Sequence, residues 1–203
     1  MSIEKELKDF QIFKETYEFK QKEIKEINGK EFCEGYPLED ENGKKIGQCE
    51  EWVNVGYGHE GAIAKVLSNL FPYEFEFRGK KLNCIESFFQ GIKFKDPTMQ
   101  TLVLKYSGFD ANRVKVCSEY DWKLTGIVYW QGQAIDRYSK EYELLVDELY
   151  ISALQNPLYR NAIKNCPVDI IHSISDQEKN NSVFTRYEFE KELNCLKEFL
   201  KDK

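Results

Sequence analysis

The sequence predicts an α+β domain that is predominantly helical and has a small β component. Apolar residues recur at helical spacing over residues 140–155 and again over residues 185–200, and such stripes predict two long amphipathic helices. Residues 73–79 instead alternate aromatic and charged side chains, which is the pattern of a half-buried strand. The chain has no strand–loop–helix with G-x-G-x-x-G or Walker spacing, so a dinucleotide-binding fold is not expected.

The composition suits a single hydrophobic core. With 203 residues, of which 41% are hydrophobic and 14% aromatic, the chain can bury one good core and is not expected to be disordered. Its net charge of −6 disfavours a general nucleic-acid binder, which needs a basic field. Its apolar runs are too short to span a bilayer and its N-terminus does not resemble a secretory signal. We therefore expect a cytoplasmic protein with no membrane partner.

The cysteines do not indicate a metal site. The chain has six cysteines without any C-x-x-C spacing, and only two histidines are available as further ligands. Free thiols of this kind are usually packed in the core. We expect no metal ion and no cofactor.

The start of the chain is expected to form an extension, residues 1–50, that packs on a domain of residues 51–203. Four apolar residues of the extension recur at roughly helical spacing: Leu7, Phe10, Phe13 and Tyr17. They predict a helix. Further along, the dipeptide Asn42-Gly43 is a strong signal for a hairpin turn.

Residues 84–94, CIESFFQGIKF, predict a helix with two different faces. Ile85, Phe88 and Ile92 fall at positions i, i+3 and i+7 and form a face for the core. A second stripe on the same helix consists of Glu86, Phe89, Gln90 and Lys93. The spacing leaves two interpretations of this stripe open, a solvated face with one stray aromatic residue or the lining of a ligand pocket.

A second strand region, around Trp130, leads into the helix predicted over residues 140–155. Asp136 and Arg137 lie at the junction between strand and helix. Asp136 either caps the helix, where acids are favoured, or contributes with Arg137 to a ligand site. The second alternative requires another cap, and Ser139 is placed to provide it.

Two further polar residues each allow a structural and a ligand-binding interpretation. His172 lies on a short apolar strand, where a histidine is usually part of the core. Asn69 follows Ser68 just before the strand of residues 73–79, and such pairs commonly tie loops through backbone hydrogen bonds. For both residues the structural role is expected first.

The last helix has a recognisable start. The sequence TRYE, from Thr185 to Glu188, is a capping box, in which the hydroxyl and the carboxylate each accept a hydrogen bond from the backbone of the other residue. Phe189, Leu193 and the leucines that follow then form one apolar face. The helix is expected to begin directly after Thr185.

Two blocks of the sequence resemble a known family. The first, LSNLFPYEFEFRGKKLNCIESFFQGIKF, has a Ser-Asn element, a glycine turn, and then a helix whose motif positions are Glu86, Phe89, Gln90, Lys93 and Phe94. The second begins IDRYSKEYELL and is followed by IIHSI and FTRYEF. In this order the two blocks, which span about residues 56–200, resemble the NADAR family (YbiA-like, formerly DUF1768).

The resemblance implies a YbiA-like fold and hydrolysis of N-glycosidic bonds. Family activities include removal of ADP-ribose from modified guanine bases, which counters ADP-ribosyltransferase toxins, and cleavage of early riboflavin-pathway intermediates. The implied partners are an ADP-ribose-containing or other ribosyl substrate, ADP-ribosylated DNA, and a toxin or defence system. The rival interpretation is a non-catalytic module that binds ADP-ribose or NAD, because binding needs only the aromatic and basic residues.

The resemblance also implies a set of site residues. Glu86 aligns with the glutamate that is regarded as catalytic in the family, and Asp136 is the second catalytic candidate. The ligand-binding candidates are Asn69, Phe89, Gln90, Lys93, Trp130, Arg137, Tyr138 and His172. Many members have an Arg-x-x-Trp element whose Trp lines the site, whereas here Tyr138 aligns with it and Trp130 and Trp122 lie nearby.

Overall fold

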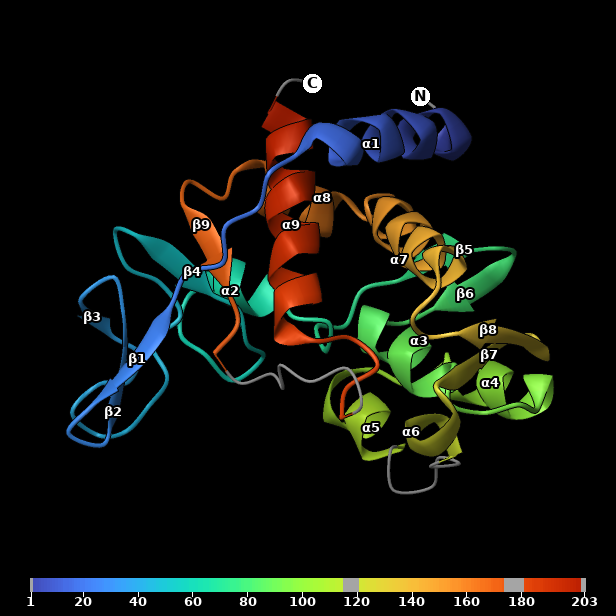
Figure 1. Ribbon diagram of the computed structural model, residues 1–203, viewed down its shortest axis with the longest axis horizontal. Helices are drawn as coiled ribbons and strands as arrows, with labels where there is room; N and C mark the ends of the chain where they lie inside the picture. The colour runs from blue at the N-terminus through green and yellow to red at the C-terminus, as the bar shows by residue number, and fades with distance from the viewer. Residues whose placement is uncertain (1, 115–120, 174–180, 202–203) are drawn as a thin grey trace.

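The computed structural model describes residues 2–114, 121–173 and 181–201. The helices in these ranges are α1 (Ile3–Thr16), α2 (Ala62–Val66), α3 (Ile85–Gly91), α4 (Pro97–Val103), α5 (Gly108–Arg113), α6 (Asp121–Thr125), α7 (Lys140–Ala153), α8 (Pro157–Lys164) and α9 (Arg186–Lys201). The strands are β1 (Ile24–Ile27), β2 (Lys30–Cys33), β3 (Tyr36–Pro37), β4 (Trp52–Asn54), β5 (Phe75–Phe77), β6 (Lys80–Leu82), β7 (Ile127–Trp130), β8 (Gln133–Asp136) and β9 (Asp169–Ile171). The predicted α+β class with predominant helix is confirmed (Figure 1). Among these helices none is long and apolar enough to cross a bilayer.

The strands of the described residues form small separate sheets. β1, β2 and β3 form an antiparallel sheet, and β5–β6 and β7–β8 are two antiparallel hairpins. β4 and β9 pair in parallel, with Trp52 opposite Asp169, and so join two segments that are far apart in the sequence. This parallel pair brings the segment that follows β4 close to the segment that follows β9, because parallel strands end at the same edge.

Both hairpins turn through residues with positive φ angles. The values are 47° at Arg78 and 71° at Gly79 in the first turn, and 49° at Gln131 and 84° at Gly132 in the second. Positive φ at both central positions is the geometry that matches the twist of the flanking strands. The predicted strand that ends at Gly79 and the predicted strand region around Trp130 are both confirmed, and each is part of a hairpin.

The core lies around α7 and α9. The stripes predicted for these helices are buried: Tyr142, Leu145, Val146, Leu149, Tyr150 and Ala153 on α7, and Phe189, Leu193, Leu196 and Leu200 on α9. In Figure 1, α9 runs through the middle of the molecule, and α8, β9 and α1 pack against it. The apolar stripes are thus buried as predicted, and on α9 residues outside the stripe, such as Glu190 and Lys197, are buried as well.

Helix α3 presents its predicted core face to the interior. Ile85, Phe88 and Ile92 are fully buried, so this part of the prediction is confirmed. At the start of the helix, the backbone N–H of Glu86 donates to the carbonyl oxygen of Asn69 at 2.7 Å. That bond satisfies one of the free amides of the helix N-terminus and holds the Ser-Asn loop against it.

The starts of α9 and α7 follow the capping rules. In the predicted capping box, Glu188 Oε2 accepts from the backbone N–H of Thr185 at 2.8 Å, and Thr185 Oγ1 accepts from the backbone N–H of Glu188 at 3.3 Å. For α7 the alternative left open by the sequence is decided. Ser139 is the N-cap and its Oγ accepts from the backbone N–H of Tyr142 at 3.2 Å.

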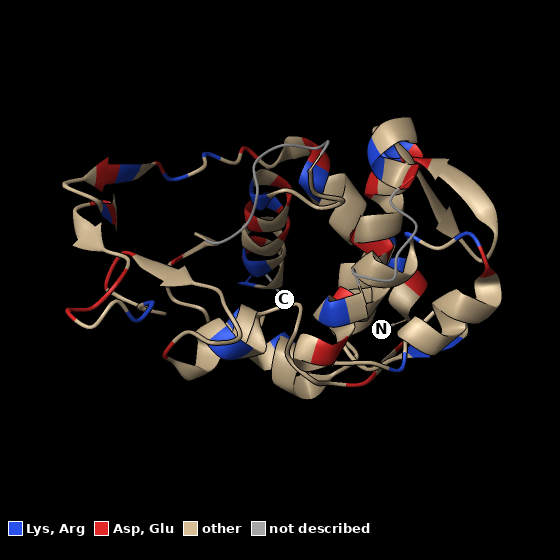
Figure 2. Cartoon of the chain, turned by 90° about the horizontal axis from the view of Figure 1, so that it is seen from below, with Lys and Arg blue, Asp and Glu red and all other residues tan. Residues whose placement is uncertain are grey.

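The N-terminal helix packs on the rest of the chain. α1 contacts α7 and α9, and its Phe10 is fully buried. Arg160 of α8 donates two hydrogen bonds, of 3.0 and 2.8 Å, to the two carboxylate oxygens of Glu6. The β1–β2–β3 sheet lies at one end of the molecule, and acidic and basic residues are interspersed along the chain (Figures 1 and 2). The division into residues 1–50 and 51–203 stays a prediction.

Two further predictions concern the turn and the thiols. The turn at Asn42-Gly43 is confirmed, because Glu39 and Lys45 on either side of it form an antiparallel bridge.

Five described cysteines are free, and all except the half-buried Cys49 are buried: Cys33, Cys49, Cys84, Cys166 and Cys195. Burial raises the pKa of the Cys84 thiol to about 12, which keeps it protonated. Cys117 lies outside the described residues.

Candidate active site

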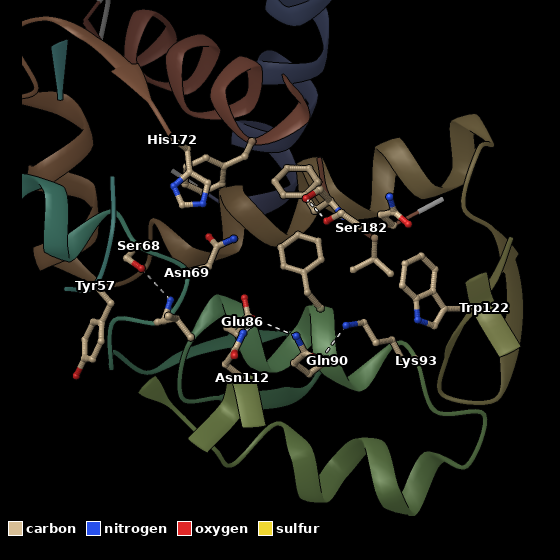
Figure 3. A pocket seen from close by; sticks show the side chains of 16 residues that line it. Tyr57, Ser68, Asn69, Glu86, Gln90, Lys93, Asn112, Trp122, His172 and Ser182 are labelled. Carbon is tan, nitrogen blue, oxygen red and sulfur yellow. Dashed lines mark hydrogen bonds between the residues drawn. The ribbon is translucent and has the colours of Figure 1, made fainter. Parts of the chain in front are cut away.

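A cavity of about 290 Å³ opens beside α3. It is lined by residues of several segments: Tyr57, Ser68, Asn69, Leu70, Glu86, Phe89, Gln90, Lys93, Asn112, Trp122, His172, Asn181, Ser182, Val183, Phe184 and Phe189. Figure 3 shows α3 along one wall and His172 on the opposite side. The second stripe of α3 is therefore the lining of a pocket rather than a solvated face.

Three polar residues of α3 and its C-terminal end form a hydrogen-bonded row. Gln90 Nε2 donates to Glu86 Oε1 at 2.7 Å, and Lys93 Nζ donates to Gln90 Oε1 at 2.8 Å (Figure 3). Spacings of four and three residues put these side chains on one face of a helix. The amide of Gln90 therefore has a fixed orientation, with its nitrogen toward the carboxylate and its oxygen toward the ammonium.

A second amide holds the same carboxylate oxygen. Asn112 of α5 donates through Nδ2 to Glu86 Oε1 at 3.2 Å. Among the described residues, no hydrogen bond is made to Glu86 Oε2. Two amides thus fix the half-buried carboxylate through one oxygen and leave the other for a ligand, a pre-organised arrangement that suits catalysis at that oxygen.

The Ser-Asn loop contributes the neighbouring wall. Tyr150 donates its hydroxyl to Asn69 Oδ1 at 2.8 Å, so the Nδ2 of Asn69 keeps its donors for other partners. Ser68 Oγ accepts from the backbone N–H of Leu70 at 3.3 Å, as expected for a loop-tying residue. Asn69 therefore holds the loop in place and also lines the cavity, while its ligand-binding role stays a prediction.

His172 lies directly after β9 and has a defined tautomer. Its Nδ1 is 2.7 Å from the carbonyl oxygen of Val55, which can only accept, so Nδ1 carries the proton and Nε2 is an acceptor. Burial lowers the pKa of His172 to about 4, in spite of the opposing effect of the bond to Val55. The imidazole packs on Phe189 with ring centroids 4.7 Å apart. At pH 7 it is a neutral hydrogen-bond acceptor.

We expect the His172 ring to remain neutral down to about pH 4. The native pKa is below the ordinary value of 6.5, so the unfolded chain binds the proton first as the pH falls. The contribution of this group to stability is complete above pH 6.5 and is lost between pH 6.5 and 4. A ¹⁵N NMR titration checks this, with a His172→Gln variant to assign the signal. A midpoint at or above pH 6 would contradict the assignment.

Aromatic side chains form the remaining surface of the cavity. Phe89 and Phe184 are stacked, with centroids 4.7 Å apart and an interplanar angle of 15°. Trp122 is buried and lies 5.7 Å from Lys93 Nζ, measured to the ring centroid. These rings give a planar ligand apolar faces next to the polar row.

Comparison with known proteins identifies the family. The family model described as "Bacteriophage protein GP30.3" matches residues 61–198, which is more than half of the chain. This protein belongs to the GP30.3 family. A relative in Enterobacteria phage T4, the uncharacterized 17.1 kDa protein in the Gp30-rIII intergenic region, is 30% identical over 139 residues. That alignment covers 66% of this chain and 90% of the phage protein.

One solved structure is also similar, the NMR structure of the E. coli protein YbiA. The likeness has a TM-score of 0.47 and 15% sequence identity, and it covers 75% of this chain and 86% of YbiA. The GP30.3 match contains most of the cavity lining, from Ser68 to Phe189, and Tyr57 lies just before it.

Six of the ten residues that the sequence resemblance implied for the site line the cavity: Asn69, Glu86, Phe89, Gln90, Lys93 and His172. The other four do not. The carboxylate of Asp136 is exposed and accepts from the backbone N–H of Tyr138 at 2.8 Å, and the Tyr138 ring is 53% exposed. Arg137 is buried in an ion pair with Glu188, its guanidinium 4.4 Å from the Tyr142 ring centroid.

Trp130 is the fourth predicted residue that the structure places elsewhere. It is buried against Phe77 and Phe88, with centroids 5.0 and 5.5 Å away, on the core side of α3. Trp122, which the resemblance left as an alternative, lines the cavity instead. We leave Asp136, Arg137, Tyr138 and Trp130 out of the proposed site.

Several lining residues of the cavity were not predicted from the sequence. Tyr57, Asn112 and Phe184 come from loops or a short helix that show no apolar periodicity. Only the glycine-rich stretch around Tyr57 and the position of Phe184 directly before the capping box marked these segments as special. Neither signal indicates a ligand.

Proposed function

We propose that this GP30.3-family protein is an N-glycoside hydrolase of the NADAR type. Its substrate is an ADP-ribosylated guanine base or nucleoside, from which it removes ADP-ribose. The observation that carries the proposal is the Glu86 carboxylate, held in the cavity through Oε1 by Gln90 and Asn112 while Oε2 makes no hydrogen bond to a described residue. The sequence resemblance, whose motif residues include Glu86, Gln90 and Lys93, supports the same function.

The cleavage of an N-ribosyl bond suits a fixed carboxylate. Cleavage of a ribosyl–nitrogen bond builds positive charge at the anomeric carbon of the sugar, and a nearby carboxylate stabilises that charge and activates the attacking water. The lining supplies partners for the ribose hydroxyls, because Asn69 Nδ2 is a donor and His172 Nε2 an acceptor. The neutral imidazole of His172 adds no second positive charge to the cavity at pH 7, so Lys93 is the cation among the described lining residues.

Lys93 gives the cavity a cationic end. The Gln90 amide links the Glu86 carboxylate to the Lys93 ammonium through hydrogen bonds of 2.7 and 2.8 Å, so one amide separates the two charged groups. A phosphate group attached to the ribose can span that separation. An ammonium group binds phosphate oxygens through charge-assisted hydrogen bonds, so the diphosphate of ADP-ribose is expected at this end.

Incubation of the protein with ADP-ribosylated guanosine, followed by mass spectrometry, tests the proposal. We expect stoichiometric release of ADP-ribose and guanosine. A parallel incubation with early riboflavin-pathway intermediates tests the other activity that the resemblance implies. Tight binding of ADP-ribose without turnover of either substrate would contradict the proposed hydrolase and favour a non-catalytic binding module.

A further inference from the structure

The two ends of the cavity differ in chemistry. In Figure 3, Lys93 and Trp122 lie at one end, Tyr57 lies at the other, and Glu86 lies between them. Among the described lining residues, Glu86 and Lys93 carry formal charge, while His172 is neutral at pH 7 because burial lowers its pKa to about 4. An anionic part of a ligand is therefore attracted toward Lys93. The end at Tyr57 offers an aromatic and uncharged surface.

Other aromatic side chains hold Tyr57 in place. Its ring packs edge-to-face against Phe109 at 5.2 Å and against Phe71 at 6.3 Å, with interplanar angles of 75° and 73°. Gly108, at the start of α5, approaches closely, because a Cβ added there would lie 3.7 Å from the Tyr57 hydroxyl oxygen. The backbone N–H of Gly108 donates to the carbonyl of Leu70 at 2.9 Å and joins α5 to the Ser-Asn loop.

We propose that Tyr57, supported by Phe71 and Phe109, forms a subsite for a planar, uncharged heteroaromatic ring. The description of that ring as the leaving group rests on the proposed hydrolase function, whereas the subsite itself rests on the geometry. A ligand then lies along α3 with its phosphate toward Lys93, its ribose at Glu86 and its ring at Tyr57. Heteroaromatic rings of any base stack favourably on aromatic side chains, because every base has a flat π-face.

This orientation is consistent with the chemistry of the cleavage. The C–N bond breaks and its electron pair goes to the ring nitrogen. Water forms the new C–O bond at the anomeric carbon and gives one proton to the Glu86 carboxylate, which returns to its ionised form by passing that proton to the released nitrogen. An aromatic and uncharged subsite binds the neutral released ring without a charged partner.

Calorimetric binding of two small probes tests the subsite. The probes are guanosine 5′-monophosphate, which has phosphate, ribose and ring, and ribose 5-phosphate, which lacks the ring. The full chain with Glu86→Gln serves as the background so that neither probe is consumed. We expect the nucleotide to bind this background about tenfold more tightly than the sugar phosphate, as stacking of one base predicts.

Adding Tyr57→Leu to this background is expected to abolish the difference between the probes and to leave ribose 5-phosphate affinity unchanged. Phe109→Ala, at a 55% exposed position where folding is little affected, should reduce the difference about threefold through a less firmly held ring. Tyr138→Leu is the matched control, because Tyr138 is 53% exposed and lies outside the cavity lining. It should change neither affinity.

The outcomes separate the subsite from the proposed function. A nucleotide preference that persists in both Tyr57→Leu and Phe109→Ala would overturn the subsite alone. A preference that is lost in Tyr57→Leu, in a protein that hydrolyses no ribosyl substrate, would support the subsite and contradict the hydrolase. Failure of both probes to bind at millimolar concentration would overturn both proposals together.

Discussion

Replacement of Glu86 by Gln is expected to lower the rate of N-ribosyl hydrolysis by about 10³-fold. The variant keeps the size of the side chain, and its carbonyl oxygen can still accept from the amides of Gln90 and Asn112. It loses the negative charge that stabilises the transition state. Because ground-state contacts are retained, affinity for ADP-ribose should remain within about threefold of the native value.

Two measurements on the same preparations check this prediction. Release of ADP-ribose from ADP-ribosylated guanosine is followed by mass spectrometry, and ADP-ribose binding by calorimetry. Glu76→Gln is a matched control, because Glu76 is exposed on β5 and lies outside the cavity lining. Turnover by the Glu86→Gln protein within tenfold of the native rate, on the order of one kcal/mol in barrier, would rule out a catalytic carboxylate.

Replacement of Lys14 by Met is expected to lower the free energy of unfolding at pH 8 by about 3–5 kcal/mol. Lys14 of α1 forms ion pairs with Asp147 of α7 and Glu192 of α9, and both carboxylates are buried. Burial acts to lower the pKa of Lys14, but Glu192 and Asp147 outweigh it and raise the pKa. Removal of the ammonium leaves two buried carboxylates without a counter-ion.

The loss should be smaller at pH 5. Burial raises the native pKa of Glu192 to about 7, against an ordinary value of 4.5, although Lys14 opposes the shift. The native state therefore takes up this proton before the unfolded chain does, and protonation favours folding as the pH falls from about 7 to 4.5. In the variant the protonated carboxyl removes one of the two uncompensated charges.

Urea unfolding at pH 8 and pH 5 checks both statements. Lys8→Met is the control, because Lys8 lies on the same helix and is exposed, and it should change the free energy of unfolding by less than about 0.5 kcal/mol. An equal effect of the two substitutions at pH 8 would show that the buried ion pairs do not hold α1 in place.

Apolar periodicity is the reason that much of the fold could be predicted. The core faces of α3, α7 and α9 follow from apolar residues repeated at helical spacing. Such residues form a stripe along one side of the helix, and the helix must turn that side toward the core to remove the stripe from water. Local chemistry also fixed the ends of elements. The capping box of Thr185 and Glu188 and the turn at Arg78-Gly79 depend on a few neighbouring residues.

Contacts between distant segments could not be predicted in this way. Lys14 looks like a solvated residue of an amphipathic helix, yet its partners Asp147 and Glu192 lie 133 and 178 residues further along the chain. Asn112 reaches Glu86 from another helix, and nothing in its own segment indicates this. In the same way, Arg137 lies at the junction between β8 and α7, where the sequence allowed a ligand-binding role, but its charge is neutralised by Glu188 of α9.

The position of a bound substrate relative to Glu86 tests the central claim most directly. Crystals of the Glu86→Gln protein are soaked with ADP-ribosylated guanosine, which this variant should bind without cleavage. The proposed function predicts the anomeric carbon within about 4 Å of the substituted side chain, and a phosphate beside Lys93, because reacting atoms in a productive complex approach at about 3–3.5 Å. Substrate bound outside this cavity, or bound in it with the anomeric carbon remote from position 86, would contradict the claim.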